Sequence, residues 1–210
     1  MKKAIVLATV VVGSHLWTDP VSAKGIAGKG VKGGLALATM VGKDMEEADR
    51  NTGVILGGYI TYDVNDKLSL QPEIFYSQKG YRIDQSESFF GATMSVKGTT
   101  SLNYLEVPLL GVYTVHDRLR LFAGPSVGLY LNGKTEAEIS FAGESESMSE
   151  DINSDSVTSP DIGWVVGGLF DVGKITVEGR YSAGISSVPS GDEASDMKHQ
   201  VIQLMVGYPF

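Results

Sequence analysis

Charged side chains recur inside stretches of this sequence that are otherwise apolar, and they are the first candidates for chemistry. Burying a charge is costly unless it is paired and hydrogen-bonded. We therefore predict that these charges form an interior network of ion pairs. Its members are Glu73, Glu106, Glu178, Arg180 and Arg120, with Lys32 and Lys79 as further cations. We expect the network to specify packing and not to gate a channel, because a switch needs a second conformational state.

Glu178 and Arg180 suggest how such a network could be arranged. They are two residues apart, so on a strand their side chains face the same side. From that side they could join a carboxylate across the interior, either Glu73 or Glu106.

Catalysis by a histidine base is the second chemistry to consider, and His199 is the candidate. A hydrolase could combine it with a serine nucleophile and an orienting carboxylate from the same region. The available residues are Ser182, Ser186, Ser187, Asp192 and Asp196. However, no Gly-x-Ser-x-Gly elbow occurs on a strand-to-helix turn, and Asp196 and His199 lack the spacing of an Asp-x-His pair. We therefore predict no catalytic residues and no enzyme activity.

Carboxylates also gather between residues 132 and 160, where they could bind a divalent cation. They are Glu136, Glu138, Glu144, Glu146, Glu150, Asp151 and Asp155. Their spacing lacks the order of an EF-hand, and acidic, serine-rich segments are usually just solvated. The chain has no cysteine, which excludes thiolate metal sites. We predict no metal site and no cofactor.

The N-terminus has the pattern of an export signal. Residues 1–3 include the positively charged Lys2 and Lys3, residues 4–13 are apolar, and residues 21–23 are small or apolar, as before a cleavage site. We predict a signal peptide over residues 1–23 and a single domain over residues 24–210. Loss of the signal changes 17 basic and 25 acidic residues to 15 and 24, a net charge of −9. This charge argues against nucleic acid as a partner.

The elements that must position these residues are strands. Eight segments alternate apolar with small or polar residues, namely 30–39, 53–62, 67–80, 101–114, 118–131, 161–171, 174–184 and 200–210. Short turns fall at 63–66, 116–117 and 172–173, and long polar connections at 40–52, 81–100, 132–160 and 185–199. We expect the long connections to be solvated loops. Turns on one rim and loops on the other are typical of outer-membrane barrels, whose turns lie in the periplasm.

The last predicted strand indicates which face of the sheet meets lipid. Its apolar face carries Phe210, Tyr208, Val206, Leu204 and Ile202. In a bilayer the outward face must be apolar while the inside can be polar, so we expect these five residues to point outward. The alternative is a soluble barrel or sandwich, in which the apolar face would point inward.

Outward aromatic residues gather at both ends of the predicted strands. Tyr62, Tyr113, Phe170, Tyr208 and Phe210 fall at the turn end, and Tyr76, Trp164 and Tyr181 at the loop end. Two such girdles are typical of transmembrane barrels. The predicted fold is therefore all-β, an eight-stranded antiparallel up-and-down transmembrane β-barrel in the bacterial outer membrane, with both termini in the periplasm.

Motifs that carry a family resemblance are spread over the whole mature chain. They lie at residues 31–38, 68–80 with Gln71-Pro72-Glu73, 102–110 with Tyr104-Leu105-Glu106-Val107-Pro108-Leu109, 122–128, 178–184 and 206–210. With this set the chain resembles the PorT-like outer-membrane β-barrel family, although Pro209 departs from the usual pattern. The resemblance implies an OmpA-like barrel that the outer-membrane assembly machinery inserts by reading the apolar and aromatic residues of the last strand. It implies no single biochemical activity.

Several functions remain open for such a barrel. The leading one is a structural or interaction scaffold that acts through its extracellular loops, in envelope integrity, adhesion or as an accessory to protein secretion. The alternatives are a narrow or gated pore, a lipid-modifying enzyme and a soluble ligand-binding barrel, although an eight-stranded lumen is only wide enough for side chains. Expected partners are outer-membrane lipid and lipopolysaccharide, the assembly machinery, and an extracellular or secretion-system protein.

Overall fold

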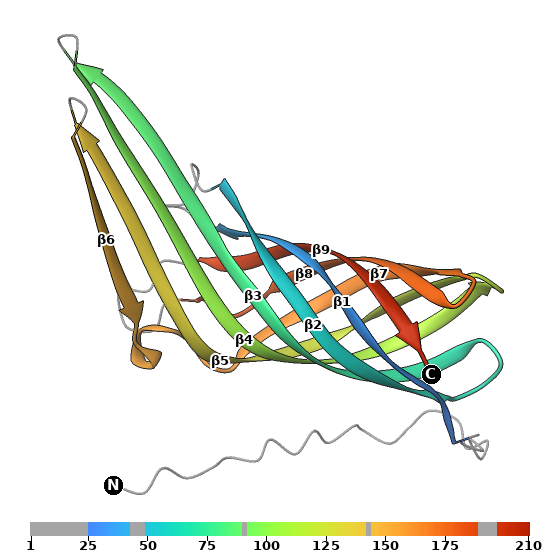
Figure 1. Cartoon of the computed structure of the whole chain (residues 1–210). Helices are drawn as coiled ribbons and strands as arrows, with labels where there is room; N and C mark the ends of the chain where they lie inside the picture. Colours follow the sequence, from blue (N-terminus) through green and yellow to red (C-terminus); the bar gives the residue numbers. More distant parts are fainter. Residues whose placement is uncertain (1–24, 43–48, 90–91, 142–143, 189–196) are drawn as a thin grey trace, which may run out of the picture.

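The computed structural model describes residues 25–42, 49–89, 92–141, 144–188 and 197–210 as antiparallel strands with their connections (Figure 1). The strands are β1 (Ile26–Val41), β2 (Asp49–Asp63), β3 (Leu68–Phe89), β4 (Ala92–His116), β5 (Leu119–Phe141), β6 (Glu144–Ile152), β7 (Asp161–Val172), β8 (Ile175–Gly184) and β9 (Lys198–Pro209). A single 3-10 turn, η1 (Ser154–Ser156), precedes β7. The predicted signal peptide, residues 1–23, lies outside the described residues.

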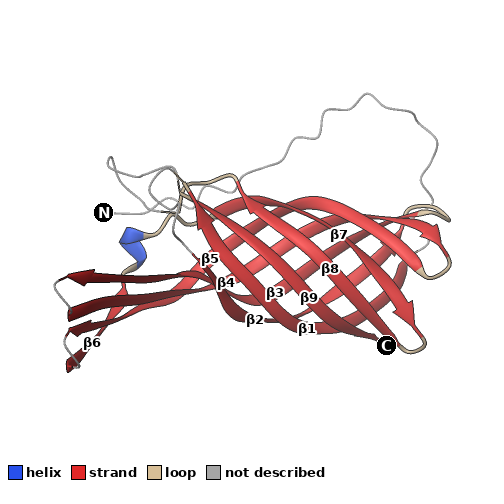
Figure 2. Cartoon of the chain, turned by 90° about the horizontal axis from the view of Figure 1, so that it is seen from above, coloured by secondary structure: helices blue, strands red, loops and turns tan. Residues whose placement is uncertain are grey.

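Eight of the nine strands close into a ring. Each of these strands pairs antiparallel with the next one along the chain, except that β5 pairs with β7 and β9 returns to β1. Strand β6 pairs with the far part of β5 and lies outside the ring. Figure 2 shows the closed barrel, with strands that tilt strongly against its axis. The prediction of an eight-stranded antiparallel up-and-down barrel is confirmed.

Alternation along the strands sets the two faces of the barrel wall. In β9, Gln203 is buried inside the barrel, while its neighbours Ile202 and Leu204 are exposed on the outer surface. In β4, whose two faces are similarly apolar, the buried Glu106 points inward with Leu102 and Leu110 on the same side. A one-residue shift would reverse every side chain, so this polar residue fixes the register of an otherwise ambiguous strand.

One rim of the barrel carries only short connections between described strands, and we call it the turn rim. At the β2–β3 turn, the Asn65 side chain accepts hydrogen bonds from the backbone N–H groups of Lys67 and Leu68, each at 2.9 Å. At the β7–β8 turn, Gly173 has φ +64°, a conformation that side-chain-bearing residues rarely adopt. The chain ends at the same rim, where the Phe210 N–H donates to the Lys29 carbonyl at 2.9 Å. The opposite end is the loop rim.

The prediction that residues 81–100 and 132–160 are solvated loops is wrong for most of both segments. Strand β3 continues to Phe89, β4 begins at Ala92, β5 continues to Phe141, and β6 pairs with β5 along its whole length. These parts form a four-stranded sheet that projects from the loop rim (Figures 1 and 2). We call it the extension. Both of its faces meet solvent, and its many Ser, Glu and Asp residues give it the composition of a solvated loop.

The outward aromatic residues form the two predicted girdles. Tyr62, Tyr113, Phe170, Tyr208 and Phe210 are exposed near the turn rim, and Tyr76, Trp164 and Tyr181 are exposed toward the loop rim. Large apolar residues are exposed between them, among them Leu56 and Leu204. The outside of the ring is therefore the apolar surface that a bilayer requires. No helix in the part of the chain that the structure describes is long and apolar enough to cross a membrane.

Candidate functional site

Four charged residues meet in the middle of the barrel lumen, and we call them the central charge group. The Lys32 ammonium on β1 lies 2.7 Å from Glu73 Oε1 on β3 and 2.5 Å from Glu178 Oε2 on β8. The Arg180 guanidinium contacts Glu178 on its own strand and Glu73 Oε2 at 2.9 Å. Two cations and two carboxylates balance each other. The lumen at this level is therefore filled by a neutral, closely paired cluster, as buried charges require.

Aromatic rings and an amide complete the surroundings of the central charge group. The Arg180 guanidinium lies between two rings, 5.2 Å from the centroid of Phe75 and 5.3 Å from that of Phe122. Arginine stacks favourably on aromatic faces, which here also hold its planar group in position. Gln71 donates to Glu73 Oε1 at 2.8 Å and accepts from the Thr61 hydroxyl at 3.0 Å. These contacts help to hold the charged side chains in place.

A second cluster, the upper charge group, lies between the central group and the loop rim. The Lys79 ammonium on β3 lies 2.6 Å from Glu106 Oε1 on β4 and 3.1 Å from Asp161 Oδ2 on β7. It also lies 4.8 Å from the centroid of the Tyr104 ring. All three charged side chains are buried. This group joins three strands around the lumen and adds a second filled layer.

The structure divides the five predicted network residues among three places. It brings Glu73, Glu178 and Arg180 together with Lys32, whereas Glu106 belongs to the upper charge group. Arg120 lies near the turn rim, where it donates to both oxygens of Asp171, at 2.7 and 2.9 Å.

Asp161 and Asp171 are two further members that were not predicted. Both share the inward parity of β7, opposite to the outward Trp164 and Phe170, and that alternation could have found them.

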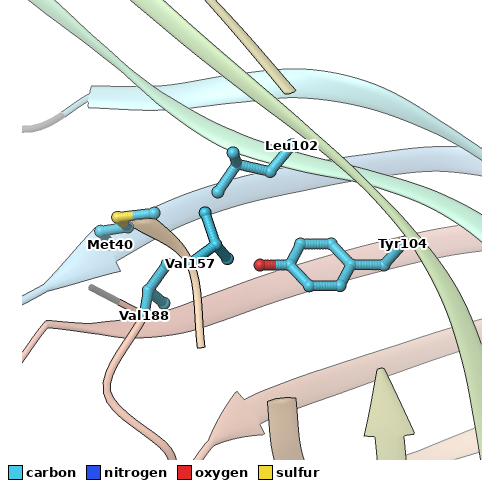
Figure 3. Close-up of a cluster of buried hydrophobic side chains, with 5 residues drawn as sticks. All are labelled: Met40, Leu102, Tyr104, Val157 and Val188. Atoms are coloured by element: carbon cyan, nitrogen blue, oxygen red, sulfur yellow. The ribbon is translucent and has the colours of Figure 1, made fainter. Parts of the chain in front are cut away.

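A cluster of buried apolar side chains closes the lumen at the loop rim. Its members are Met40, Leu102, Tyr104, Val157 and Val188, which come from β1, β4, the segment before β7 and the segment after β8 (Figure 3). Tyr81, Tyr130 and Ile152 pack against it from the base of the extension. The Tyr130 hydroxyl donates to the Ile152 carbonyl at 2.8 Å, which ties β5 to the end of β6. We call this set the mouth cluster.

His199, the candidate base, is held inside the barrel below the mouth cluster. It is 1% exposed, and its Nε2 lies 3.4 Å from the Tyr104 hydroxyl on the opposite wall. Ser182 and His199 line one small cavity inside the barrel. The Ser186 hydroxyl instead accepts a hydrogen bond from the Ile162 N–H at 3.0 Å. Asp192 and Asp196 lie outside the described residues. Among the residues that the structure describes, this base therefore does not meet a nucleophile and an acid at an accessible surface.

The carboxylates of the acidic segment are spread along the extension. Glu136 and Glu138 lie on β5, and Glu144, Glu146 and Glu150 on β6. Among the residues with described positions, no three His, Cys, Asp or Glu side chains are grouped so that they could hold a metal ion.

A row of hydrogen-bonded polar residues separates the apolar belt from the extension on the outer surface. The Tyr76 hydroxyl donates to Asn103 Oδ1 at 2.8 Å, and Asn103 Nδ2 donates to Asn132 Oδ1 at 2.7 Å. Below this row the outer surface carries residues such as Leu105 and Leu129, which are paired across β4 and β5. Amide side chains are costly in hydrocarbon but fit the interfacial region. The row therefore marks where the chain leaves the membrane.

Above the row, the outer face of the extension is polar and hollowed. Two adjoining hollows, of about 480 and 610 Å³, share Thr99 and Glu136 in their walls. Lys134 donates to Glu136 Oε1 at 2.8 Å on this face, and this hydrogen bond raises the pKa of the Lys134 ammonium. Charges of both signs alternate here, which is typical of a solvated surface.

Comparisons with known proteins place this architecture in a family. No curated protein matches the sequence. Among solved structures, Ail, the attachment invasion locus protein of Yersinia pestis, is similar at 18% identity and a TM-score of 0.48, over 87% of this chain and 98% of that chain. Neisserial surface protein A is similar at 13% identity and a TM-score of 0.44, over 89% and 100%. Neither likeness assigns a function at these values.

The family comparison covers most of the chain. Residues 27–189 match the family described as outer membrane protein beta-barrel domain. The match begins at β1 and runs through β8, so it includes both charge groups and the extension. The chain belongs to this family and is a transmembrane β-barrel of the bacterial outer membrane.

Proposed function

We propose that this barrel is a binding scaffold that holds the extension outside the cell, and that it does not conduct. The observation that carries the proposal is the combination of a filled lumen with a sheet that continues far beyond the ring. Strands β3, β4 and β5 have 22, 25 and 23 residues. A spanning strand needs about 9 to 11 residues. The excess length is ordered structure that anchoring the barrel does not require.

The packing of the lumen supports a scaffold and not a pore. An eight-stranded barrel has room only for its own side chains. Here the central charge group, the upper charge group and the mouth cluster follow one another along the axis. To open a path for ions or solutes, paired charges would have to separate in a medium of low dielectric constant. That separation has a high free-energy cost.

The family's membrane and the difference between the two rims support one orientation of the barrel. We propose that the turn rim and both ends of the mature chain face the periplasm, with the extension outside. Outer-membrane lipid and lipopolysaccharide would then surround the apolar belt. The aromatic and apolar residues of β9, which point outward, are the proposed signal for the assembly machinery.

An enzymatic role has little support in the geometry. The buried His199 is out of reach of a lipid or protein substrate at the surface. We therefore infer a non-catalytic role, of which adhesion and envelope integrity are the broad forms. The resemblance to the PorT-like family suggests an accessory role in protein secretion, because members of that family are linked to secretion. This suggestion rests on the resemblance alone.

The test compares the full chain with a shortened one in which residues 83–97 and 136–149 are each replaced by a four-residue turn. Heat-modifiable mobility on a denaturing gel checks that the shortened barrel folds. We expect cells that display the full chain to adhere to host-cell or extracellular-matrix surfaces, and cells with the shortened chain to lose that adhesion. Neither protein should conduct in planar bilayers. Equal adhesion by both, or steady single-channel currents from the full chain, would contradict the proposal.

A further inference from the structure

The extension has two faces of different chemistry. Antiparallel pairing places Ile83, Gly98, Ala137 and Met148 in one row across the four strands. The next row toward the tip contains Gln85, Val96, Ile139 and Glu146. This face has the same parity as Leu102 and Ile152, which belong to or pack against the mouth cluster. It therefore continues the inner wall of the barrel, and we call it the inner face.

Apolar side chains on the inner face remain accessible. Met94, Ile139 and Met148 are exposed, while Ile83 and Val96 are half-buried. The position above Gly98 is open, with no atom within 4 Å of where a Cβ would stand. Contiguous exposed apolar surface on a soluble part of a protein often marks an interaction site. The face is thus an apolar strip that no described segment covers.

The charges of the extension are sorted between its two faces. The described charged side chains of the inner face beyond the mouth cluster are all carboxylates, Glu144, Glu146 and Glu150 of β6. The outer face carries both signs, from Arg82, Lys97 and Lys134 and from Asp84, Glu136, Glu138 and Asp151. The inner face therefore combines an apolar strip with an acidic border, whereas charges on the outer face nearly cancel.

We propose that the inner face binds a cationic, amphipathic polypeptide segment in an extended conformation. Apolar side chains of the segment would cover the strip, and its Lys or Arg side chains would pair with the carboxylates of β6. Glu144 and Glu146 are two residues apart on a strand, a spacing of about 7 Å that matches alternate side chains of a second extended chain. Complementary charge sets specificity and on-rate in such contacts.

The same chemistry argues against an anionic ligand on this face. Phosphate groups of lipopolysaccharide would meet carboxylates there, and like charges in close contact are unfavourable. This inference rests on the proposed function, because it names the partner class of the same extension. Beyond that function, it specifies that the inner face binds and that the partner carries positive charge.

The test uses the absence of cysteine in the chain to attach one environment-sensitive dye. Met148→Cys places the dye on the inner face, and Ser147→Cys places it on the outer face at the same height on β6. The full chain is reconstituted in nanodiscs of phosphatidylcholine. The probe is a capped nonapeptide of alternating Lys and Val, and its control is the matching Glu and Val peptide.

We expect the Lys-Val peptide to shift the emission of the dye at position 148 in a saturable way, and the Glu-Val peptide to have no effect. The dye at position 147 should not respond. Glu146→Gln with Glu150→Gln should weaken binding about ten-fold or more, since close charge pairs at interfaces often exceed 1.4 kcal/mol. Asp84→Asn with Glu138→Gln removes the same charge from the outer face and should change the affinity less than about two-fold.

Three results would overturn the inference even if the peptide binds. They are a dye at position 148 that is already shielded without peptide, an equal response at position 147, and equal weakening by the two pairs of substitutions. Failure of the peptide to bind, together with adhesion that still requires the extension, would reject the inference and leave the proposed function standing. If instead the full chain binds the peptide but the shortened chain adheres as well as the full chain, the proposed function is rejected and the inference stands.

Discussion

Arg180 on β8 and Glu73 on β3 meet at 2.9 Å although their strands stand on opposite walls of the barrel. Four steps around the ring separate β3 from β8 in either direction. The ion pair therefore spans the lumen. With Lys32 and Glu178 it ties three strands into one neutral cluster. The backbone hydrogen bonds of the wall link only neighbouring strands, so ion pairs across the lumen such as this one hold the shape of the ring and fill it.

Loss of Arg180 should strongly destabilise the barrel. Arg180→Met leaves two buried carboxylates facing one lysine, and breaking a buried pair typically costs about 3–5 kcal/mol. We expect a lower urea midpoint in lipid vesicles and unfolding at a lower temperature on gels. Adding Glu73→Gln should recover part of the loss, because it removes the uncompensated charge.

The matched control for Arg180 is Lys134→Met. This lysine also pairs with a glutamate, but in solvent on the extension. Exposed ion pairs contribute little, so the unfolding midpoint should not change measurably. Similar losses in the two variants would show that the lumen pair does not carry the stability assigned to it.

Glycine at position 124 is required by close approach of two strands. A Cβ added there would overlap the backbone carbonyl oxygen of Leu109. Because backbone cannot yield as a flexible side chain does, Gly124→Ala should cost about 1–3 kcal/mol. Gly179→Ala is the control, since no atom lies within 4 Å of its added Cβ. Unfolding curves of the two variants should differ, and equal stability would contradict the packing of β4 against β5.

A charge on the outer surface should report the membrane. Leu204 lies near the middle of β9 and is 64% exposed on the outside of the ring. If that outside is hydrocarbon, Leu204→Lys should cost about 2–4 kcal/mol in folding from urea into vesicles, the value for a lysine at the bilayer midplane. Ser147→Lys on the extension should cost nothing measurable. A harmless lysine at position 204 would be incompatible with a lipid-facing β9.

The last aromatic residue should matter more for assembly than for stability. Phe210→Ala removes the terminal side chain that the assembly machinery is proposed to read, so the amount of heat-modifiable protein in the outer membrane should fall several-fold. Tyr62→Ala removes another exposed aromatic at the same rim and should leave the amount nearly unchanged. Refolding of both purified variants in vitro separates the two effects, because the machinery is absent there.

How well a strand of this fold can be predicted from the sequence depends on the environment of its two faces. In β9, one face meets lipid and the other the lumen, so Leu204 and Gln203 alternate visibly and the strand can be predicted. In the extension both faces meet water, and the pairing of Glu138 with Ser147 depends on backbone hydrogen bonds that leave no pattern in the sequence. Composition alone therefore predicts solvated loops at residues 81–100 and 132–160.

The candidate site was predictable in kind but not in its pairings. Parity along each strand identifies Glu73, Glu106 and Arg120 as inward. Which charges meet depends on the stagger between strands and on the tilt of the barrel, which a single sequence does not reveal. As a result, the structure has three separate groups of inward charges. Glu106 pairs with Lys79, Arg120 pairs with Asp171, and the third group surrounds Arg180.

The central claim is that the extension lies outside the cell while the turn rim lies in the periplasm. It is tested most directly by labelling single cysteines on intact cells with a membrane-impermeant maleimide. Ser147→Cys reports on the extension, and Asp117→Cys reports on the exposed β4–β5 turn. We predict that position 147 is labelled on intact cells and that position 117 is labelled only after lysis. Labelling of position 117 on intact cells, with position 147 protected, would contradict the account.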